Sequence, residues 1–261
     1  RQFPDAHIVV SAVEHESVLS PAHDYDCREI ALQKDGTVDL EVLKNTIDDK
    51  TVLVSVMYAN NEIGTIEPIR EIAEIVRQKR AERARHLPLY FHTDACQAAN
   101  YLDLHVSRLG VDLLTLNGGK IYGPKQSGVL FVGSRVALKP LIQGGGQERM
   151  LRSGTENVAQ SIGIAEALNI TQQLRASETK RLQQLQKQFY DLIETKIPQA
   201  IINGSRKKRL PNNMHITIPG QDNERLLILL DEAGILAAAG SACSASDEEP
   251  SHVLRAIGLS D

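Results

Sequence analysis

Four groups of polar residues that could carry out chemistry each follow a short apolar run of the sequence. They are His15, the segment 60–64, the pair Asp94 and Gln97, and the segment 117–120, which ends in a lysine. If the apolar runs are parallel strands of one sheet, these residues meet in the crevice beyond the carboxyl ends of the strands. Each residue alone could equally satisfy local hydrogen bonds of its own loop.

Spacing excludes several binding motifs. Lys120 is not the lysine of a P-loop, because the upstream glycine and the following Ser or Thr are missing. The three glycines at 144–146 lack the strand-turn-helix setting of a dinucleotide fingerprint. The histidines do not show zinc-ligand spacing, so no metal site is expected. A carboxylate and a lysine at neighbouring strand ends do suit pyridoxal phosphate (PLP), which needs a lysine for its Schiff base and a carboxylate beside its ring nitrogen.

Cys243 is a second candidate for chemistry, in a stretch of small residues from 237 to 246. With few side chains to fix it in a core, the stretch could form a mobile loop that carries a nucleophile towards a substrate. A small buried cysteine in a tightly packed segment is equally consistent with the composition. Cys27 and Cys96 are interpreted as structural.

The elements that must position these residues fall into two patterns. Up to about residue 170, apolar β-branched runs alternate with longer polar or amphipathic stretches, and they cover residues 7–11, 51–56, 87–92, 111–116 and 128–132. Pro68, followed by apolar residues at helical spacing from Ile69 to Val76, predicts a helix between the second and third runs. This alternation predicts an α/β fold with a mainly parallel, doubly wound sheet.

The pattern changes after about residue 170, so we expect a large α/β domain over 1–172 and a smaller α+β domain over 173–261. Apolar residues at spacings of three and four predict a long amphipathic helix over 177–197. A strand over 214–218 and a short helix ending at Gly234 follow it. The basic runs 77–85 and 206–209 are interpreted as a solvated helix end and a solvated loop.

The composition is that of a globular protein, with 261 residues of which 42% are hydrophobic. The net charge of −4, from 29 basic and 33 acidic residues, disfavours nucleic acid or an anionic membrane as the main partner. No apolar run is long enough for a membrane span, and the first residues lack the apolar core of a signal peptide. Three cysteines are too few for a disulfide framework, so a reduced cytoplasmic protein fits best.

Seven segments in order carry a family resemblance over nearly the whole chain. They cover residues 13–19, 60–64, 93–98, 119–125, 144–149, 152–157 and, as the last, 240–243 leading to 249–255. Together they resemble the cysteine desulfurases of the NifS/IscS type, within the class V aminotransferase group of fold-type I PLP enzymes. The resemblance implies the fold of those enzymes, with a mainly parallel doubly wound sheet and a smaller C-terminal α+β domain.

The resemblance implies PLP as cofactor and assigns the residues around its ring. Lys120 would form the Schiff base and move the Cα proton of the substrate, while Asp94 would pair with the ring nitrogen. Asn61 and Gln97 would bind near the phenolic oxygen. His15 would stack on the ring and could act as an acid or a base.

The resemblance also implies partners. Cys243 would attack the sulfur of bound L-cysteine, releasing L-alanine and leaving a persulfide for a sulfur-acceptor protein such as an iron–sulfur scaffold. Thr155 would reach the phosphate of the partner subunit's cofactor in a homodimer.

Three departures from the family pattern concern phosphate and substrate binding. Asn117 and Gly119 stand where the family has a serine and a histidine, so Asn117 could still donate a hydrogen bond whereas Gly119 offers only its backbone. The family also has an earlier helix N-terminus that binds phosphate and a later arginine that binds the substrate carboxylate. We expect both to lie outside this chain, which begins with an arginine and is interpreted as incomplete.

Two alternatives remain open at this point. One is a class V transaminase or a selenocysteine lyase, and the transaminase would not require Cys243. The other is a non-catalytic or truncated desulfurase-like protein that acts as a binding partner, an interpretation motivated by Gly119 and by the missing segments.

Overall fold

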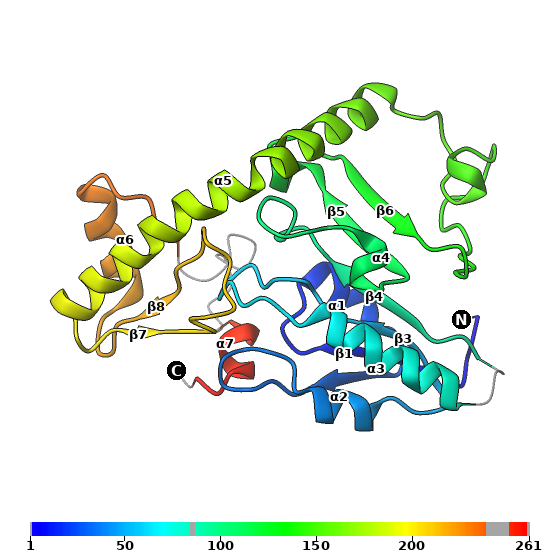
Figure 1. The fold of residues 1–261 in the computed structure, drawn as a ribbon, viewed down its shortest axis with the longest axis horizontal. Coiled ribbons are helices and arrows are strands. Elements are labelled where there is room, and N and C mark those ends of the chain that lie inside the picture. Colours follow the sequence, from blue (N-terminus) through cyan, green and yellow to red (C-terminus); the bar gives the residue numbers. More distant parts are fainter. Residues whose placement is uncertain (1, 84–86, 239–250, 260–261) are drawn as a thin grey trace.

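The computed structural model describes residues 2–83, 87–238 and 251–259. Six strands form the central sheet in the order β2–β1–β3–β4–β5–β6, in which β1 to β5 pair in parallel and β6 is antiparallel to β5 (Figure 1). The strands are β1 (His7–Ser11), β2 (Cys27–Ile30), β3 (Thr51–Ser55), β4 (Tyr90–Asp94), β5 (Leu113–Asn117) and β6 (Gly128–Val132). The predicted mainly parallel sheet is confirmed, and β2 is an additional edge strand that the sequence analysis did not identify.

Helices pack on both faces of this sheet, as in a doubly wound fold. The first helices are α1 (Glu16–Ala22), α2 (Leu40–Thr46), α3 (Ile69–Glu82) and α4 (Val106–Leu109). Leu19 of α1 packs with Val10, whereas α2, α3 and α4 share a larger cluster with Val9 on the opposite face. Val9 and Val10 are successive residues of β1, so their side chains point to opposite faces, and both are buried.

The predicted helix after Pro68 is confirmed as α3, which begins at Ile69. Ile72 lies three residues after Ile69 and Val76 four residues after Ile72, and both are buried against the sheet.

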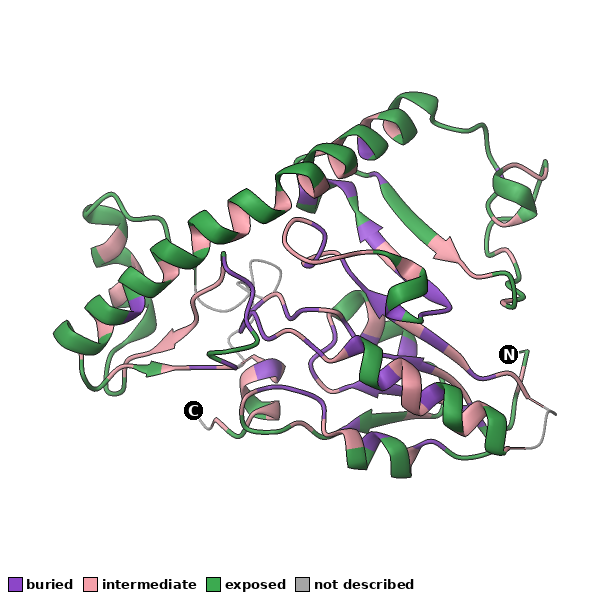
Figure 2. Ribbon diagram, in the orientation of Figure 1, coloured by how far each residue is buried: buried purple, intermediate pink, exposed green. Residues whose placement is uncertain are grey.

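A single helix, α5 (Val158–Lys196), is 39 residues long and extends well beyond the range expected from its amphipathic pattern. Figure 2 shows that most of its surface is exposed along its length. Ile164 packs it against the core, and two of its glutamines bond it to distant parts of the chain. Gln172 Nε2 donates to the carbonyl oxygens of Ala99 (2.6 Å) and Leu102 (3.2 Å). Gln186 Nε2 donates to the carbonyl oxygens of Leu210 (2.9 Å) and Asn213 (2.8 Å).

The remaining elements are small. The short antiparallel pair β7 (Ile201–Ile202) and β8 (Ile216–Thr217) is followed by α6 (Asn223–Glu232), and α7 (His252–Ala256) returns to the sheet. The strand and helix predicted here are therefore confirmed as β8 and α6, while the domain division at residue 172 stays a prediction. Two 3-10 turns, η1 (Gly118–Ile121) and η2 (Glu148–Met150), complete the fold. Among the described helices, none is long and apolar enough to cross a membrane.

A buried carboxylate fixes the pairing of β4 with β5. Asp112, which is 3% exposed, accepts hydrogen bonds at Oδ2 from Phe91 N (2.9 Å) and from Arg80 Nη2 (2.5 Å). Its other oxygen pairs with Arg135 at 3.0 Å. The two arginines offset the cost of burying a charge between the strands.

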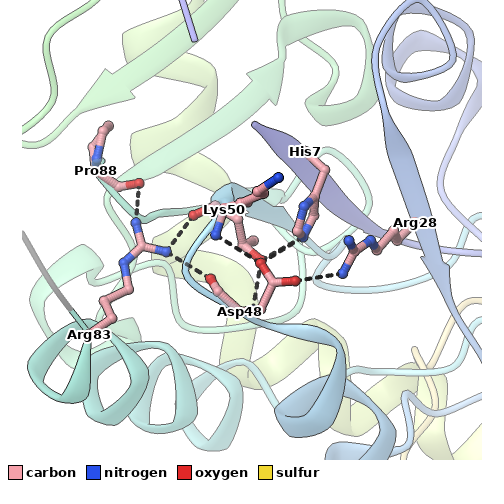
Figure 3. A network of polar contacts seen from close by, with 7 residues as sticks. His7, Arg28, Asp48, Lys50, Arg83 and Pro88 are labelled. Carbon is pink, nitrogen blue, oxygen red and sulfur yellow. Dashed lines mark hydrogen bonds and ion pairs between the residues drawn. The ribbon is translucent and has the colours of Figure 1, made fainter. Parts of the chain in front are cut away.

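A second polar network ties the amino ends of β1 and β3 to the end of α3 (Figure 3). His7 is fully buried, and its Nε2 lies 2.7 Å from Thr51 Oγ1 and 3.5 Å from Asp48 Oδ1. Arg83 donates to the carbonyl oxygens of Thr51 (2.5 Å) and Pro88 (2.6 Å). Burial lowers the pKa of His7, so its ring is neutral near pH 7.

The basic runs 77–85 and 206–209 were predicted to be solvated, and this prediction is wrong for three of their arginines, which bind groups of the protein. Arg80 and Arg83 bind Asp112 and backbone carbonyls. Arg209 is 5% exposed and donates to the carbonyl oxygens of Asn203 and Ser205. The five-donor guanidinium can bind several backbone carbonyls at once, and the sequence alone does not reveal which carbonyls lie within its reach.

Glu67 provides a test of buried charge in this fold. Its carboxyl group is 2% exposed, Oε2 accepts from Val38 N (2.9 Å), and Oε1 has no partner among the described residues. Burial raises the pKa of Glu67 to about 8. The proton held by folded Glu67 therefore stabilises the protein at low pH, and this contribution is lost as the pH rises from about 4.5 towards about 8.

We expect Glu67→Gln to become more stable relative to the wild type as the pH rises, by up to about 1.4 kcal/mol per pH unit within that window. The amide keeps an acceptor for Val38 N and never ionises. Urea denaturation over that pH range measures the free energy of unfolding, with the exposed Glu166→Gln as the charge-matched control. Parallel profiles of wild type and Glu67→Gln would contradict the prediction.

Candidate functional site

The residues singled out in the sequence follow the carboxyl ends of four adjacent parallel strands. His15 comes after β1, Asn61 after β3, and Asp94 is the last residue of β4. Asn117 ends β5, and Lys120 lies in η1, which follows directly. The parallel sheet therefore brings these five residues to one edge, as expected.

Asp94 is the buried carboxylate of this edge. It is 9% exposed, and its Oδ1 accepts a hydrogen bond from Cys96 N at 2.8 Å. Backbone bonds on both sides fix its position, because Tyr58 N donates to the Asp94 carbonyl (2.8 Å) and Ala95 N donates to Thr115 O (2.9 Å). A carboxylate held in this way can bind a protonated ring nitrogen without first having to be ordered.

Lys120 is exposed at the same edge, and the turn η1 determines its backbone position. Asn117 caps the turn, with Oδ1 accepting from Gly119 N at 2.8 Å, which leaves the amide Nδ2 as its donor group. Gly118 is buried, and its N and O bond to Ser127 O and Gly123 N, both at 2.9 Å. An additional bond from Asn100 Nδ2 to Lys120 O measures 2.8 Å.

His15 caps the N-terminus of α1 with its side chain. Its Nδ1 accepts from Ser17 N at 3.1 Å and lies 2.8 Å from Ser17 Oγ. Since Nδ1 is the acceptor, the neutral ring carries its proton on Nε2. This hydrogen bond fixes one edge of the ring, and the ring itself remains partly exposed.

Glu14, directly before His15, is a site residue that the sequence analysis missed. It is fully buried, and its Oε1 accepts from Met57 N at 2.5 Å. Burial raises the pKa of Glu14 well above its ordinary value, the bond from Met57 N opposes this, and the nearby Asp94 carboxylate adds to it. Burial therefore favours the protonated form of Glu14, whose side chain lies near that of Asp94. Its only signal in the sequence was its place beside His15.

The turn that carries Asn61 is organised by Asn60. The Asn60 side chain is fully buried, with Nδ2 donating to Val13 O (3.0 Å) and Oδ1 accepting from the backbone N–H groups of Glu62 and Ile63 (both 2.9 Å). Gly64 closes the turn with φ +68°, and a Cβ there would lie 2.5 Å from the Asn213 side chain. Asn61 is thus held on a rigid turn while its own side chain stays partly exposed.

The other proposed residues are less constrained by the structure. Gln97 is partly buried in the turn after β4, close to the site. Thr155 is exposed in the connection between η2 and α5, which extends away from the sheet (Figure 1), so the structure does not bring it to the other site residues. Cys243 lies outside the described residues.

Cys96 is unsuited to act as a nucleophile, as its structural interpretation predicts. Burial raises the pKa of the Cys96 thiol, and the Asp94 carboxylate raises it further. Only a thiolate reacts readily, so this sulfur is inert near pH 7.

The site therefore combines a buried carboxylate, an exposed lysine, an imidazole and amide groups. Among the described residues, no group of three or more His, Cys, Asp or Glu side chains could hold a metal ion.

We expect Gly118→Ala to lower the free energy of unfolding by about 1–3 kcal/mol, the usual cost of overpacking. A Cβ at Gly118 would lie 2.0 Å from Ser127 Oγ and 2.9 Å from Pro124 O. The neighbouring Gly119→Ala is the matched control, because the nearest atom to its Cβ is Asn117 Oδ1 at 3.2 Å. Chemical denaturation of both variants makes the comparison, and equal stability losses would show that close packing of Gly118 does not hold η1 in place.

Comparisons with known proteins identify the family. A sequence model described as Aminotransferase class-V matches residues 2–259. The curated relative cysteine desulfurase IscS 1 of Archaeoglobus fulgidus is 42% identical, and the match covers 97% of this chain and 65% of the relative. The chain thus spans a little less than two thirds of the length of that relative.

Solved structures agree with this assignment. A NifS-like protein from Rickettsia africae superimposes with a TM-score of 0.85 at 32% identity, covering 99% of this chain and 68% of that chain. SspA, solved in complex with cysteine, gives a TM-score of 0.79 at 30% identity, covering 98% and 70%. The resemblance to NifS/IscS-type proteins is confirmed, and the α/β fold is that expected for fold-type I PLP enzymes. Its sequence and its fold together show that the chain belongs to the class V aminotransferase family.

Proposed function

We propose that this protein is a PLP-dependent cysteine desulfurase, which converts L-cysteine to L-alanine and keeps the sulfur as a persulfide on Cys243. The observation that carries the proposal is the pairing of β4 with β5, which places buried Asp94 and exposed Lys120 at one sheet edge. The similarity to cysteine desulfurases and to a protein solved with cysteine supports the choice of substrate.

The residues at this edge fit PLP. Asp94 would be the carboxylate that pairs with the pyridine nitrogen, and Lys120 would supply the exposed amine that holds the cofactor covalently. His15 offers a partly exposed ring whose orientation is fixed through Nδ1. Asn61 and Gln97 follow β3 and β4 and carry amide groups suited to the phenolic oxygen, and both are partly exposed.

The phosphate group of the cofactor would meet fewer side-chain donors here than the serine and histidine of the family pattern provide. Because Asn117 uses Oδ1 within the turn, its Nδ2 group is the donor available to a phosphate. Gly119 is exposed and offers only its backbone. We therefore expect weaker phosphate binding than a serine and histidine pair would give.

When bound, PLP supplies the electron sink that allows a proton to leave the Cα of an amino acid. Lys120 Nζ would take that proton and return it. Asp94 would hold the ring-nitrogen proton in place. The Cys243 thiolate would attack the sulfur of cysteine, so that the Cβ–S bond breaks, an S–S bond forms, and a proton completes alanine.

The proposal includes partners. A sulfur-acceptor protein, such as an iron–sulfur scaffold, would take the persulfide sulfur, and the protein would act in the cytoplasm. A homodimer is proposed from the family resemblance, with Thr155 reaching the cofactor of the partner subunit. The exposed position of Thr155 supports this role.

We expect Lys120→Ala to lose the visible absorbance of lysine-bound PLP, because no other amine replaces Lys120 at the end of β5. Absorbance spectroscopy after incubation with PLP and gel filtration measures this loss. Lys125→Ala is the control, since Lys125 is an exposed lysine five residues away in the following loop. An unchanged band in Lys120→Ala, or the same loss in Lys125→Ala, would contradict the assignment of Lys120.

We expect the protein to release alanine over repeated turnovers when it is incubated with PLP, L-cysteine and a thiol reductant. Cys243→Ser should reduce alanine release to the protein-free background, because the sulfur then has no acceptor. Amino-acid analysis of the supernatant measures the product.

The outcome also separates the alternatives. Full activity of Cys243→Ser would contradict the desulfurase proposal and favour a class V transaminase. A folded protein that takes up no PLP but binds a scaffold protein would be a non-catalytic relative.

A further inference from the structure

The second half of the chain contacts the two segments that carry His15 and Asn61. Helix α7 packs through Val253 into a small cluster with Val13, Met57 and Ile63, and all four side chains are at most 2% exposed. Val13 comes just before the Glu14–His15 pair, and Ile63 belongs to the turn that contains Asn61. The apolar contact therefore joins α7 to both segments.

Hydrogen bonds from α7 and its N-cap reach the same segments. His252 Nε2 lies 3.0 Å from the carbonyl oxygen of Glu14, and because that oxygen can only accept, His252 is the donor. Ser251 Oγ donates to Glu62 Oε2 at 2.5 Å. Each acceptor belongs to the residue next to a proposed cofactor contact, Glu14 beside His15 and Glu62 beside Asn61.

A third contact comes from the segment before β8. Asn213 Nδ2 donates to the Glu62 carbonyl at 2.7 Å, and Leu210 N donates to Gly64 O at 2.8 Å. The turn that carries Asn61 is thus bonded from two separate places in the second half of the chain. Within the turn, Asn60 sets the shape through its Oδ1 bonds and links the turn to Val13 O, and the bonds from the second half of the chain add to this attachment.

We propose that His252, Ser251 and Asn213 are positioning residues, which hold His15 and Asn61 in place for the cofactor ring. This inference rests on the proposed function in so far as His15 and Asn61 contact the ring. A hydrogen bond to a buried acceptor contributes through the cost of leaving that acceptor unpaired, so loss of one donor frees the segment to move.

The test combines two variants that each remove one donor with a variant that keeps it. His252→Ala removes the bond to Glu14 O, Asn213→Ala removes the bond to Glu62 O, and His252→Gln retains an N–H donor at a similar reach. Leu254→Ala is the matched control, because Leu254 packs against the same apolar cluster and makes none of these bonds through its side chain.

The first measurement is amide hydrogen exchange of the protein without cofactor. We expect about tenfold faster exchange at residues 14–19 in His252→Ala and at residues 61–64 in Asn213→Ala, because local opening becomes easier. His252→Gln should restore the wild-type rate, and Leu254→Ala, which keeps all of these bonds, should have a clearly smaller effect on both segments. Unchanged exchange in His252→Ala and Asn213→Ala, or equal effects of Leu254→Ala, would overturn the inference.

The second measurement is the PLP dissociation constant, from absorbance titration. We expect about tenfold weaker binding for His252→Ala and Asn213→Ala, and near wild-type binding for His252→Gln and Leu254→Ala. If the wild type binds PLP but releases no alanine, the desulfurase proposal fails while the positioning role stands. If exchange changes but PLP affinity does not, the bonds are merely structural and the inference is overturned.

Discussion

The pairing of β4 with β5 determines where the proposed chemistry can occur. Side chains alternate between the two faces of a strand, so a register slip of one residue would turn Asp94 away from its present environment. The register is held at one end by Asp112, whose buried carboxylate accepts a hydrogen bond from Phe91 N and forms ion pairs with two arginines. At the other end, Ala95 N bonds to Thr115 O and Tyr58 N bonds to Asp94 O. This register also sets the position of Lys120, because η1, which carries Lys120, begins directly after β5.

Much of this arrangement was predictable because it depends on local patterns. Apolar runs that alternate with amphipathic stretches predict parallel strands, and parallel strands bring their carboxyl ends together. The placement of His15, Asn61, Asp94 and Lys120 at one edge follows from that rule alone. The edge strand β2 was missed because Cys27–Ile30 has two exposed charged residues and only one buried residue.

The features that could not be predicted depend on contacts between distant residues. Glu14 is of an ionisable type that usually lies on the surface. It is buried here, where its side chain accepts a hydrogen bond from Met57 N. Arg83 and Arg209 belong to runs that look solvated, yet each donates to backbone carbonyl oxygens of distant or neighbouring loops and strands. His252 and Glu14 are far apart in the chain, and no periodicity links them. Polar contacts of this kind carry no local signal in the sequence, and the bond from His252 to Glu14 O is one to which we assign a positioning role.

The length of α5 has a mechanical consequence. A helix of 39 residues extends for about 58 Å, and two of its glutamines, Gln172 and Gln186, lie about 21 Å apart along its axis. Gln172 is bonded to Ala99, shortly after Asp94, and Gln186 is bonded to Asn213, which in turn holds the turn of Asn61. Because a continuous helix resists compression, any axial sliding of α5 displaces both attachment points by the same amount and in the same direction. The helix therefore acts as a rod that keeps the distance between these two parts of the proposed cofactor site constant.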